Sequence, residues 1–277
     1  MPARSVALAA CFAAFIPLQA TAQAEAAQVA ALFEAMSLDE LLIVMRDEGI
    51  EYGQQIAGDL FPDRSSTDWD GKVSQIYALE AMTQSIRDGL ATSLEGADMD
   101  AIVGFFEGDL GQQIIALEVS ARQALMDEAV EEASKEAAAL ALIDETPRAA
   151  LVTEFVEAND LVETNVVGAM NANYAFYVGL LDGGGMPGAM SQDDILADVW
   201  SQEPEIRQNT TEWVYSYLML AYQPLTDDQL QDYIAFSKTD PGEDINAALF
   251  ASFDAMFEGI SEALGRAASQ QMMAQDL

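Results

Sequence analysis

The sequence contains no histidine, and its only cysteine is Cys11. Without imidazole the chain cannot form a Ser-His-Asp triad, a Cys-His pair or a zinc site that uses histidine. If Cys11 is removed with an N-terminal signal, the mature chain also lacks disulfides and thiol nucleophiles. We therefore expect a protein that is not an enzyme, with no catalytic, cofactor-binding or metal-ligating residues and no cofactor.

Basic residues are scarce as well. The 277 residues include 11 lysines and arginines against 47 aspartates and glutamates, which gives a formal net charge of -36. Like-charge repulsion makes nucleic acid and anionic membrane surfaces poor partners for such a chain. However, 51% of the residues are hydrophobic, which is too many for a disordered acidic chain, so the composition predicts a folded core.

The N-terminus has the pattern of a secretory signal peptide. Arg4 precedes an apolar run from Val6 to Leu18, and Ala22–Ala24 fits an A-x-A cleavage site. The run is shorter than the roughly 20 apolar residues that cross a bilayer, and no second run follows, so we expect no transmembrane segment in the mature chain. Residues 1–24 are thus predicted to be a signal peptide cleaved near Ala24, and the mature protein is expected in the periplasm.

One alternative interpretation of the N-terminus is a lipoprotein signal. Leu8–Cys11 matches the short pattern after which lipoproteins are cleaved and acylated on cysteine. The residues after such a cysteine are normally polar and flexible, whereas here the apolar run continues past Cys11 to Leu18. We therefore favour the cleaved signal peptide.

Hydrophobic residues recur at helical spacing, and no segment shows the two-residue alternation of a strand, so the sequence predicts an all-α fold. Capping boxes, or close relatives of them, mark helix starts at Ser37, Asp160 and Thr226, each followed three residues later by Glu or Gln. Thr146 and Asp240 each precede a proline and are predicted as N-caps. The two clearest apolar stripes comprise Leu38, Leu41, Leu42, Met45, Tyr52, Ile56 and Leu60, and Ile245, Leu249, Phe253, Met256, Ile260 and Leu264.

The chain also contains an apparent internal repeat. When Trp69 is placed over Trp200 without gaps, apolar positions and turn residues coincide for more than one helix. The coinciding pairs include Met82 with Trp213, Leu94 with Leu225, Phe105 with Phe236, Asp109 with Asp240, Gly111 with Gly242, and Ile114 with Ile245.

A second register places Glu34–Glu40 over Glu157–Glu163. We therefore expect two tandem, related helical bundles that pack together, at residues 25–145 and 146–277. Each is expected to end in a long helix, and the Trp69–Trp200 and Phe105–Phe236 pairs should each occupy equivalent environments.

Short motifs that could carry chemistry have simpler structural interpretations. Gly183–Gly185 lacks the lysine of a phosphate-binding loop and is predicted to connect helices. Asp68–Gly71 resembles the centre of an EF-hand loop, but Ser66 and Tyr77 stand where the motif needs Asp and Glu, so a helix-start turn is favoured. The many methionines are interpreted as core residues, with Met272–Met273 the pair most exposed.

The segment Phe105–Ile114 resembles the Phe-Tyr-x-Ser-Pro-x-Gly-x-Lys motif of a secreted bacterial family, domain of unknown function 2059, and Phe236–Gly242 resembles a second copy. Leu225–Leu230 is similar to the Phe-Thr-x-Glu-Glu-Leu motif of that family, and Leu32–Met45 to its opening helix. Gly108 and Asp109 depart from the Ser-Pro of the motif. The resemblance implies a secreted helical fold in two copies and no particular reaction.

Three functions are compatible with these observations. The first is a non-catalytic periplasmic protein that binds an unknown protein or envelope component, or that assists envelope maintenance. The second is a binding module for a small apolar ligand or a divalent cation, in the groove between the copies or on the acidic faces. The third is a carboxylate-based hydrolase, for which no pair of acids stands out from the abundant carboxylates.

The signal peptide predicts a new N-terminus. Mass spectrometry of the protein purified from the periplasm is expected to find a chain that begins near Glu25. An intact Met1, or an acyl group on Cys11, would contradict the predicted localisation.

Overall fold

The computed structural model describes residues 17–61, 67–184 and 191–273, with side chains from residue 26 onward. Within these ranges every regular element is an α-helix and there is no strand, which confirms the predicted all-α class. The helices are α1 (Pro17–Ala35), α2 (Leu38–Leu60), α3 (Thr67–Ile76), α4 (Leu79–Ser93), α5 (Met99–Glu107), α6 (Asp109–Ala124), α7 (Glu128–Ile143), α8 (Pro147–Ala158), α9 (Leu161–Asp182), α10 (Gln192–Ala221), α11 (Asp227–Ser237) and α12 (Asp240–Met273).

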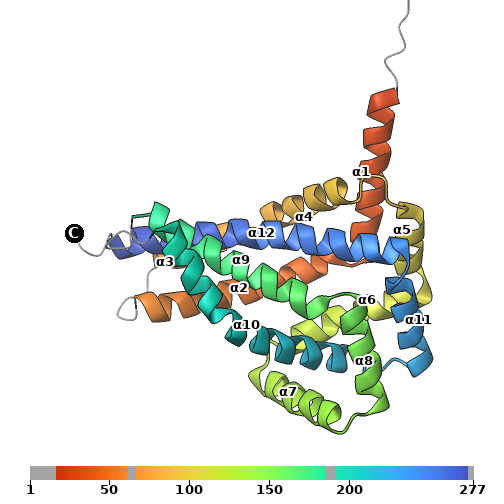
Figure 1. Ribbon diagram of the computed structural model, residues 1–277. Helices are drawn as coiled ribbons and strands as arrows, with labels where there is room; N and C mark the ends of the chain where they lie inside the picture. Colours follow the sequence, from red (N-terminus) through yellow and green to blue (C-terminus); the bar gives the residue numbers. More distant parts are fainter. Residues whose placement is uncertain (1–16, 62–66, 185–190, 274–277) are drawn as a thin grey trace, which may run out of the picture.

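The long helix α12 is the axis of the molecule (Figure 1). It packs most extensively along α9, and its other sides contact α2, α3, α4, α5 and α11. The two helices are in close contact where they cross. A Cβ atom added to Gly179 of α9 would lie only 2.9 Å from the amide nitrogen of Arg266, and one added to Gly265 of α12 would lie only 2.9 Å from the amide nitrogen of Leu180. Glycines at the crossing therefore let the two backbones touch.

Each of the two main hydrophobic core clusters contains residues from both predicted bundles. The largest core cluster joins side chains of α1–α5, among them Leu32 and Ile86, to Ile245 and Leu264 of α12. A second cluster joins Ile114 of α6 to residues of α8, α10 and α11. The boundary near residue 145 lies in the short turn between α7 and α8, but the halves share their cores across it.

Two of the predicted helix starts are confirmed by side-chain hydrogen bonds. Thr226 and Gln229 form a reciprocal capping box at α11. Thr146 accepts a hydrogen bond from the amide of Ala149, ahead of Pro147 in the first turn of α8. At α12 the cap was predicted one residue late: the Thr239 hydroxyl accepts from the amide of Gly242 at 3.2 Å, and Asp240 is already helical.

Helices α2 and α9 begin directly after Ser37 and Asp160, as predicted, but the capping boxes predicted at these two residues are wrong. Both residues have left-handed backbone angles, with φ of 48° for Ser37 and 50° for Asp160, and neither side chain caps its helix. A normal N-cap is extended, which lets its side chain reach the N3 amide, whereas these residues turn the chain sharply between two helices. Glu163, the expected second member at α9, instead binds Arg207 at 2.7 Å.

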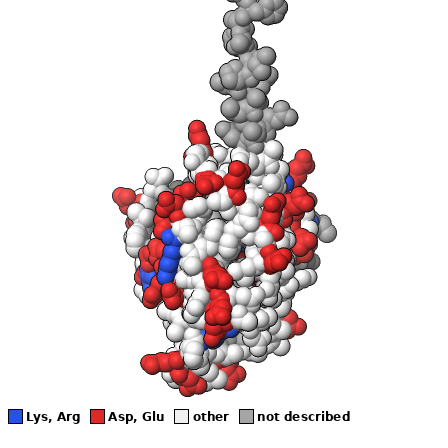
Figure 2. Space-filling model, turned by 90° about the vertical axis from the view of Figure 1, so that its right-hand side faces the viewer, with Lys and Arg blue, Asp and Glu red and all other residues white. Residues whose placement is uncertain are grey.

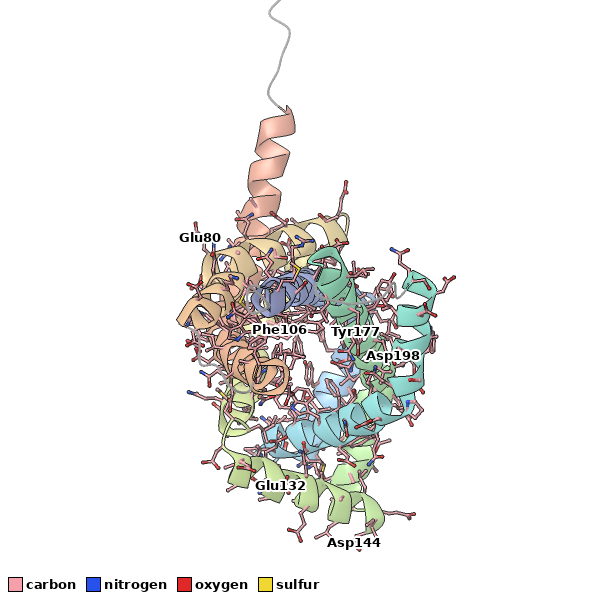
Figure 3. The ribbon with its side chains drawn as sticks, turned by 90° about the vertical axis from the view of Figure 1, so that its left-hand side faces the viewer. Glu80, Phe106, Glu132, Asp144, Tyr177 and Asp198 are labelled. Carbon is pink, nitrogen blue, oxygen red and sulfur yellow. The ribbon has the colours of Figure 1, made fainter. Side chains whose placement is uncertain are left out.

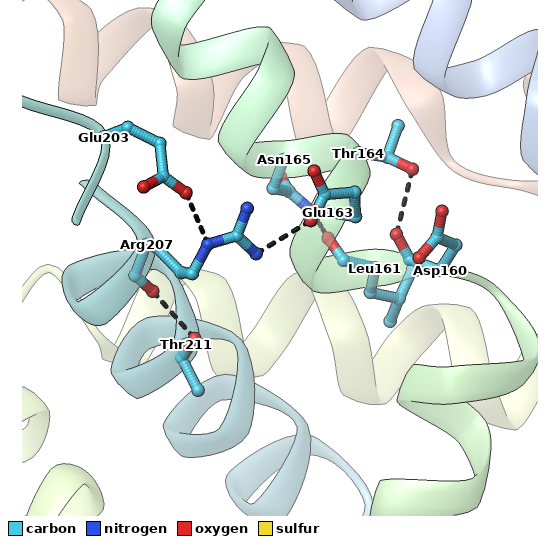
Figure 4. A network of polar contacts seen from close by, with 8 residues as sticks. All are labelled: Asp160, Leu161, Glu163, Thr164, Asn165, Glu203, Arg207 and Thr211. Carbon is cyan, nitrogen blue, oxygen red and sulfur yellow. Dashed lines mark hydrogen bonds and ion pairs between the residues drawn. The ribbon is translucent and has the colours of Figure 1, made fainter. Parts of the chain in front are cut away.

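Arg207 ties α9 to α10 (Figure 4). Its guanidinium donates to Glu163 on α9 and to Glu203 one turn before it on α10. All three side chains retain substantial solvent exposure, so this link adds little to stability. Glu163 is therefore engaged with α10 and does not bond back to the start of its own helix.

Two expected equivalences between the halves differ in the structure. Trp69 is 1% exposed and donates to the carbonyl oxygen of Gly53 at 2.8 Å, whereas Trp200 is 60% exposed on α10. The predicted long final helix of the first half breaks at Leu125–Asp127 into α6 and α7, because Asp127 caps a new helix by accepting from the amides of Ala129 and Val130. Its counterpart α12 continues without a break.

Phe105 and Phe236 lie against each other. Their ring centroids are 3.7 Å apart and the rings are nearly parallel. Each is followed by a glycine that closes a tight turn: a Cβ on Gly111 would lie 2.6 Å from the Cα of Phe106, and one on Gly242 would lie 2.8 Å from the Cα of Ser237. The backbone around Phe105 therefore resembles that around Phe236, and the two side chains pack on each other.

The remaining sequence predictions concern the signal peptide, two short motifs and the C-terminal methionines. The predicted signal peptide lies largely outside the described residues, and so does most of the Gly183–Gly188 connection. Asp68–Gly71 lies within the first turns of α3 rather than in a loop. Met273 is 42% exposed, but Met272 packs against the main core. None of the described helices is long and apolar enough to cross a membrane.

Two glycines of α12 form a matched pair for testing the turn. Gly242→Ala should destabilise the protein by about 1–3 kcal/mol, because the new methyl group overlaps backbone atoms of Phe236 and Ser237. Gly259→Ala meets no atom within 4 Å and should stabilise the same helix by up to about 1 kcal/mol. Urea denaturation of both variants measures the difference. Equal midpoints would show that the turn at Gly242 tolerates a side chain.

Candidate functional site: a cavity between the two halves

A cavity of about 490 Å³ lies between the N-terminal and C-terminal halves of the chain. Helices α2, α5 and α6 line it from one half, and α8, α9, α10, α11 and α12 line it from the other. Its volume is within the range of roughly 300–1,000 Å³ typical of small-molecule sites. Figure 3 looks into the molecule and shows Phe106 and Tyr177 near its centre, while Glu80, Glu132, Asp144 and Asp198 lie at the periphery.

The walls of the cavity are rich in aromatic side chains. Trp213 stacks on Tyr217 with ring centroids 5.1 Å apart, and Phe155 lies 4.8 Å from Tyr233. Aliphatic residues such as Leu249 complete the apolar surface. The aromatic lining consists of Phe106, Phe155, Trp213, Tyr217, Tyr222, Tyr233, Phe236, Phe250, Phe253 and Phe257.

Glu118 on α6 places a carboxyl group among these rings. The hydroxyl of Tyr222 donates to its Oε1 atom at 2.7 Å, and the hydroxyl of Tyr217 donates to its backbone carbonyl at 3.2 Å. Burial raises the pKa of Glu118 to about 7, because the surrounding protein replaces the water that would solvate a carboxylate. The hydroxyls of Tyr222 and Tyr233 act in the opposite direction but do not restore the ordinary pKa.

The three tyrosines near Glu118 remain protonated at neutral pH. Burial is the largest cause that raises the pKa of Tyr217, Tyr222 and Tyr233 well above the usual value, and the charge of Glu118 adds to it. Each phenol therefore keeps its proton, and Tyr217 and Tyr222 donate theirs to Glu118. Glu118 and its tyrosines form a polar cluster within the mostly aromatic and aliphatic lining.

Arg122, one turn after Glu118, is the basic residue of the cavity lining. Its charge is taken up by Glu48 on α2: Nε lies 3.0 Å from Oε1, and Nη2 lies 2.7 Å from Oε2. The guanidinium also lies 5.5 Å from the ring centroid of Trp213. This double hydrogen bond joins α2 to α6 and leaves Glu118 without a cationic partner within the described part of the chain.

The lining also carries amide and carboxyl groups from other helices. Asn246 of α12 donates to the carbonyl oxygen of Asn159 at 3.0 Å, so the turn between α8 and α9 is tied to the cavity wall. Asp254 also lines the cavity, and partial burial, followed by the charge of Glu258, raises its pKa. The cavity lining thus contains two carboxyl groups, those of Glu118 and Asp254.

Glu118 does not stand out in the sequence, because the carboxylates are too numerous for any pair to be singled out. The short motifs considered there do not lead to it either: Asp68–Gly71, Gly183 and Gly184 do not line the cavity. One feature of the sequence could have indicated that Glu118 is buried. It follows Ile114, which is fully buried, by four residues, so helical spacing places its carboxylate on the apolar face of the helix.

The outer surface shows the charge that the composition predicts. In Figure 2 acidic side chains are spread over the visible face, with few basic ones and areas of uncharged residues between them. Within the described ranges no group of three or more Asp, Glu, His or Cys side chains is arranged to hold a metal ion.

Comparisons with known proteins find a family model that matches part of the chain. Residues 80–139, from α4 to α7, match the family described as "Uncharacterized protein conserved in bacteria (DUF2059)". The match supports the resemblance inferred from Phe105–Ile114, and it contains Gly111 and Glu118. No curated protein and no solved structure matches the chain.

The raised pKa of Glu118 predicts a pH-dependent stability. Between pH 4.5 and about 7 the unfolded chain loses a proton that folded Glu118 keeps, so the free energy of unfolding falls as pH rises, by at most roughly 3 kcal/mol. Glu118→Gln keeps the shape but cannot ionise. It should match the wild type at pH 4 and be the more stable protein at pH 8.

Urea denaturation at pH 4, 6 and 8 measures this difference, with exposed Glu80→Gln on α4 as the control for loss of one charge. A stability difference that is the same at every pH would show that Glu118 does not titrate in this range.

Proposed function

We propose that this is an exported, non-catalytic binding protein of the bacterial envelope, and that the cavity between its halves holds an apolar ligand. The observation that carries the proposal is the cavity itself, with a volume of about 490 Å³, an aromatic lining and a few convergent polar groups. The N-terminal signal pattern supports the periplasmic location. Of the functions considered from the sequence, the apolar-ligand module thus has the clearest physical basis.

We also propose that the chain consists of two copies of one helical unit. Support comes from three matched features: the left-handed turns at Ser37 and Asp160, the glycine turns at Gly111 and Gly242, and the mutual stacking of Phe105 and Phe236. Contacts between the halves are also reciprocal, since α12 packs on α4 while α6 packs on α10. On this proposal the cavity lies where the two copies meet.

A binding role is more consistent with the cavity than a hydrolytic one. A glycosidase of the usual kind needs a pair of carboxyl groups, one protonated and one ionised, on either side of a scissile bond. Glu118 is held by phenol groups, and the other lining carboxyl, Asp254, comes from α12 beside amide side chains. No water-activating base is paired with Glu118 among the described residues.

Filling the cavity should abolish binding of an apolar probe. Leu249→Trp adds an indole ring from α12, and Leu161→Trp does so independently from α9, so a folding defect in one variant does not end the test. Enhanced emission of N-phenyl-1-naphthylamine reports binding. Both variants are expected to weaken it at least about tenfold, equivalent to roughly 1.4 kcal/mol of binding free energy.

Leu140→Trp is the matched control, because Leu140 is 53% exposed on α7 and does not line the cavity. It should bind the probe as the wild type does. Unchanged probe binding in both folded cavity variants would mean that the probe binds elsewhere, and the proposed function would then be wrong.

A further inference from the structure

We propose that the ligand of this cavity is a lipophilic organic cation, an ammonium group on an aliphatic or aromatic body, with the ammonium seated against Glu118 and the neighbouring aromatic rings. This inference rests on the proposed function and adds the chemical class of the ligand. It is carried by the arrangement of charges and rings in the cavity lining.

The charges of the cavity favour a cation. Apart from tyrosines, its ionisable lining residues are Glu118, Asp254 and Arg122. Arg122 is neutralised by two short hydrogen bonds to Glu48, whereas neither acid forms an ion pair within the described part of the chain. A ligand cation would therefore meet an unbalanced negative potential, and an anionic head group would meet the same potential as a barrier.

The rings near Glu118 also suit a cation. Tyr217 and Trp213 are stacked on α10, and the guanidinium of Arg122 lies 5.5 Å from the centroid of the indole ring, so positive charge is already placed beside this aromatic pair. Tyr222 and Tyr233 lie 6.1 Å apart, and the Tyr222 hydroxyl reaches the carboxyl group itself. Aromatic faces attract ammonium groups most strongly where water is excluded.

A neutral ligand would use this cavity less well. Hydrocarbon placed against Glu118 deepens the burial that already disfavours its charged form, and the carboxyl gains no new partner. A cation instead brings an opposite charge to short range. The remaining volume, lined by residues such as Leu249 and Phe253, would hold the apolar body.

Binding of a permanent cation should depend on pH. The groups that face Glu118 are Arg122 on its own helix, Tyr217 of α10, Tyr222 directly after α10, and Tyr233 of α11. Glu48 of α2 holds Arg122. Since Glu118 is the one with a pKa near 7, the cation must displace its proton below that pH. Affinity is expected to fall about tenfold between pH 8 and pH 6.

The test compares three probes with the same ten-carbon chain and different head groups: decyltrimethylammonium, 1-decanol and decyl sulfate. Calorimetric titration below the micelle concentration, in 0.3 M salt at pH 8 and pH 6, gives their affinities. The high salt limits binding of the cation to the acidic outer surface. The wild type should prefer decyltrimethylammonium at pH 8.

Glu118→Gln should lose this preference and its pH dependence, with an affinity for the cation at least about tenfold lower at pH 8. Glu80→Gln removes the same charge from the exposed surface of α4 and should bind as the wild type does. Equal losses in both variants, unchanged binding in Glu118→Gln, or binding of decyl sulfate as tight as that of the cation would overturn the inference.

The Leu249→Trp and Leu161→Trp variants separate the two proposals. If filling the cavity abolishes binding of 1-decanol but the cation has no advantage over it, the cavity binds apolar molecules and only the charge preference is wrong. If filling the cavity changes the binding of none of the three probes, the proposed function is wrong as well.

Discussion

The close crossing of α9 and α12 is the constraint on which the rest of the structure depends. At Gly179 and Gly265 each helix presents bare backbone to the other, so the axes approach more closely than side chains would otherwise allow. The C-terminal half of α12 carries small residues where it meets α9, while its N-terminal half carries Phe250, Phe253 and Phe257. One helix is therefore packed tightly at one end and lines a cavity at the other.

The cavity combines two features that oppose each other energetically. Aromatic walls exclude water, and that exclusion makes an ionised carboxyl group costly. Glu118 avoids this cost because its raised pKa keeps it protonated up to about pH 7, and its carboxyl group also accepts a hydrogen bond from Tyr222. Arg122 could have neutralised it but is held by Glu48, which ties α2 to α6. The carboxyl group is thus left available to a ligand.

Local sequence patterns predicted local structure well where no distant contact competed. Thr146 and Thr226 cap their helices as expected, because a cap depends on a few adjacent residues. Ser37 and Asp160 carry the same pattern, but their backbone turns the chain between packed helices. Glu163 accepts a hydrogen bond from Arg207 of another helix and not from the start of its own. The exposure of Trp200 likewise reflects what packs beside α10, which no local pattern encodes.

The sequence by itself determined the all-α class, most helix starts, the acidic surface and the segment that resembles a bacterial family, since these follow from composition, periodicity and short motifs. Only the tertiary structure decided that the halves share their cores, that Phe105 stacks on Phe236, and that Glu118 lies in an aromatic cavity. The reason is that burial and charge pairing depend on residues far apart in the chain. Glu118 and Tyr222 are 104 positions apart, and the fold alone brings their oxygens to 2.7 Å.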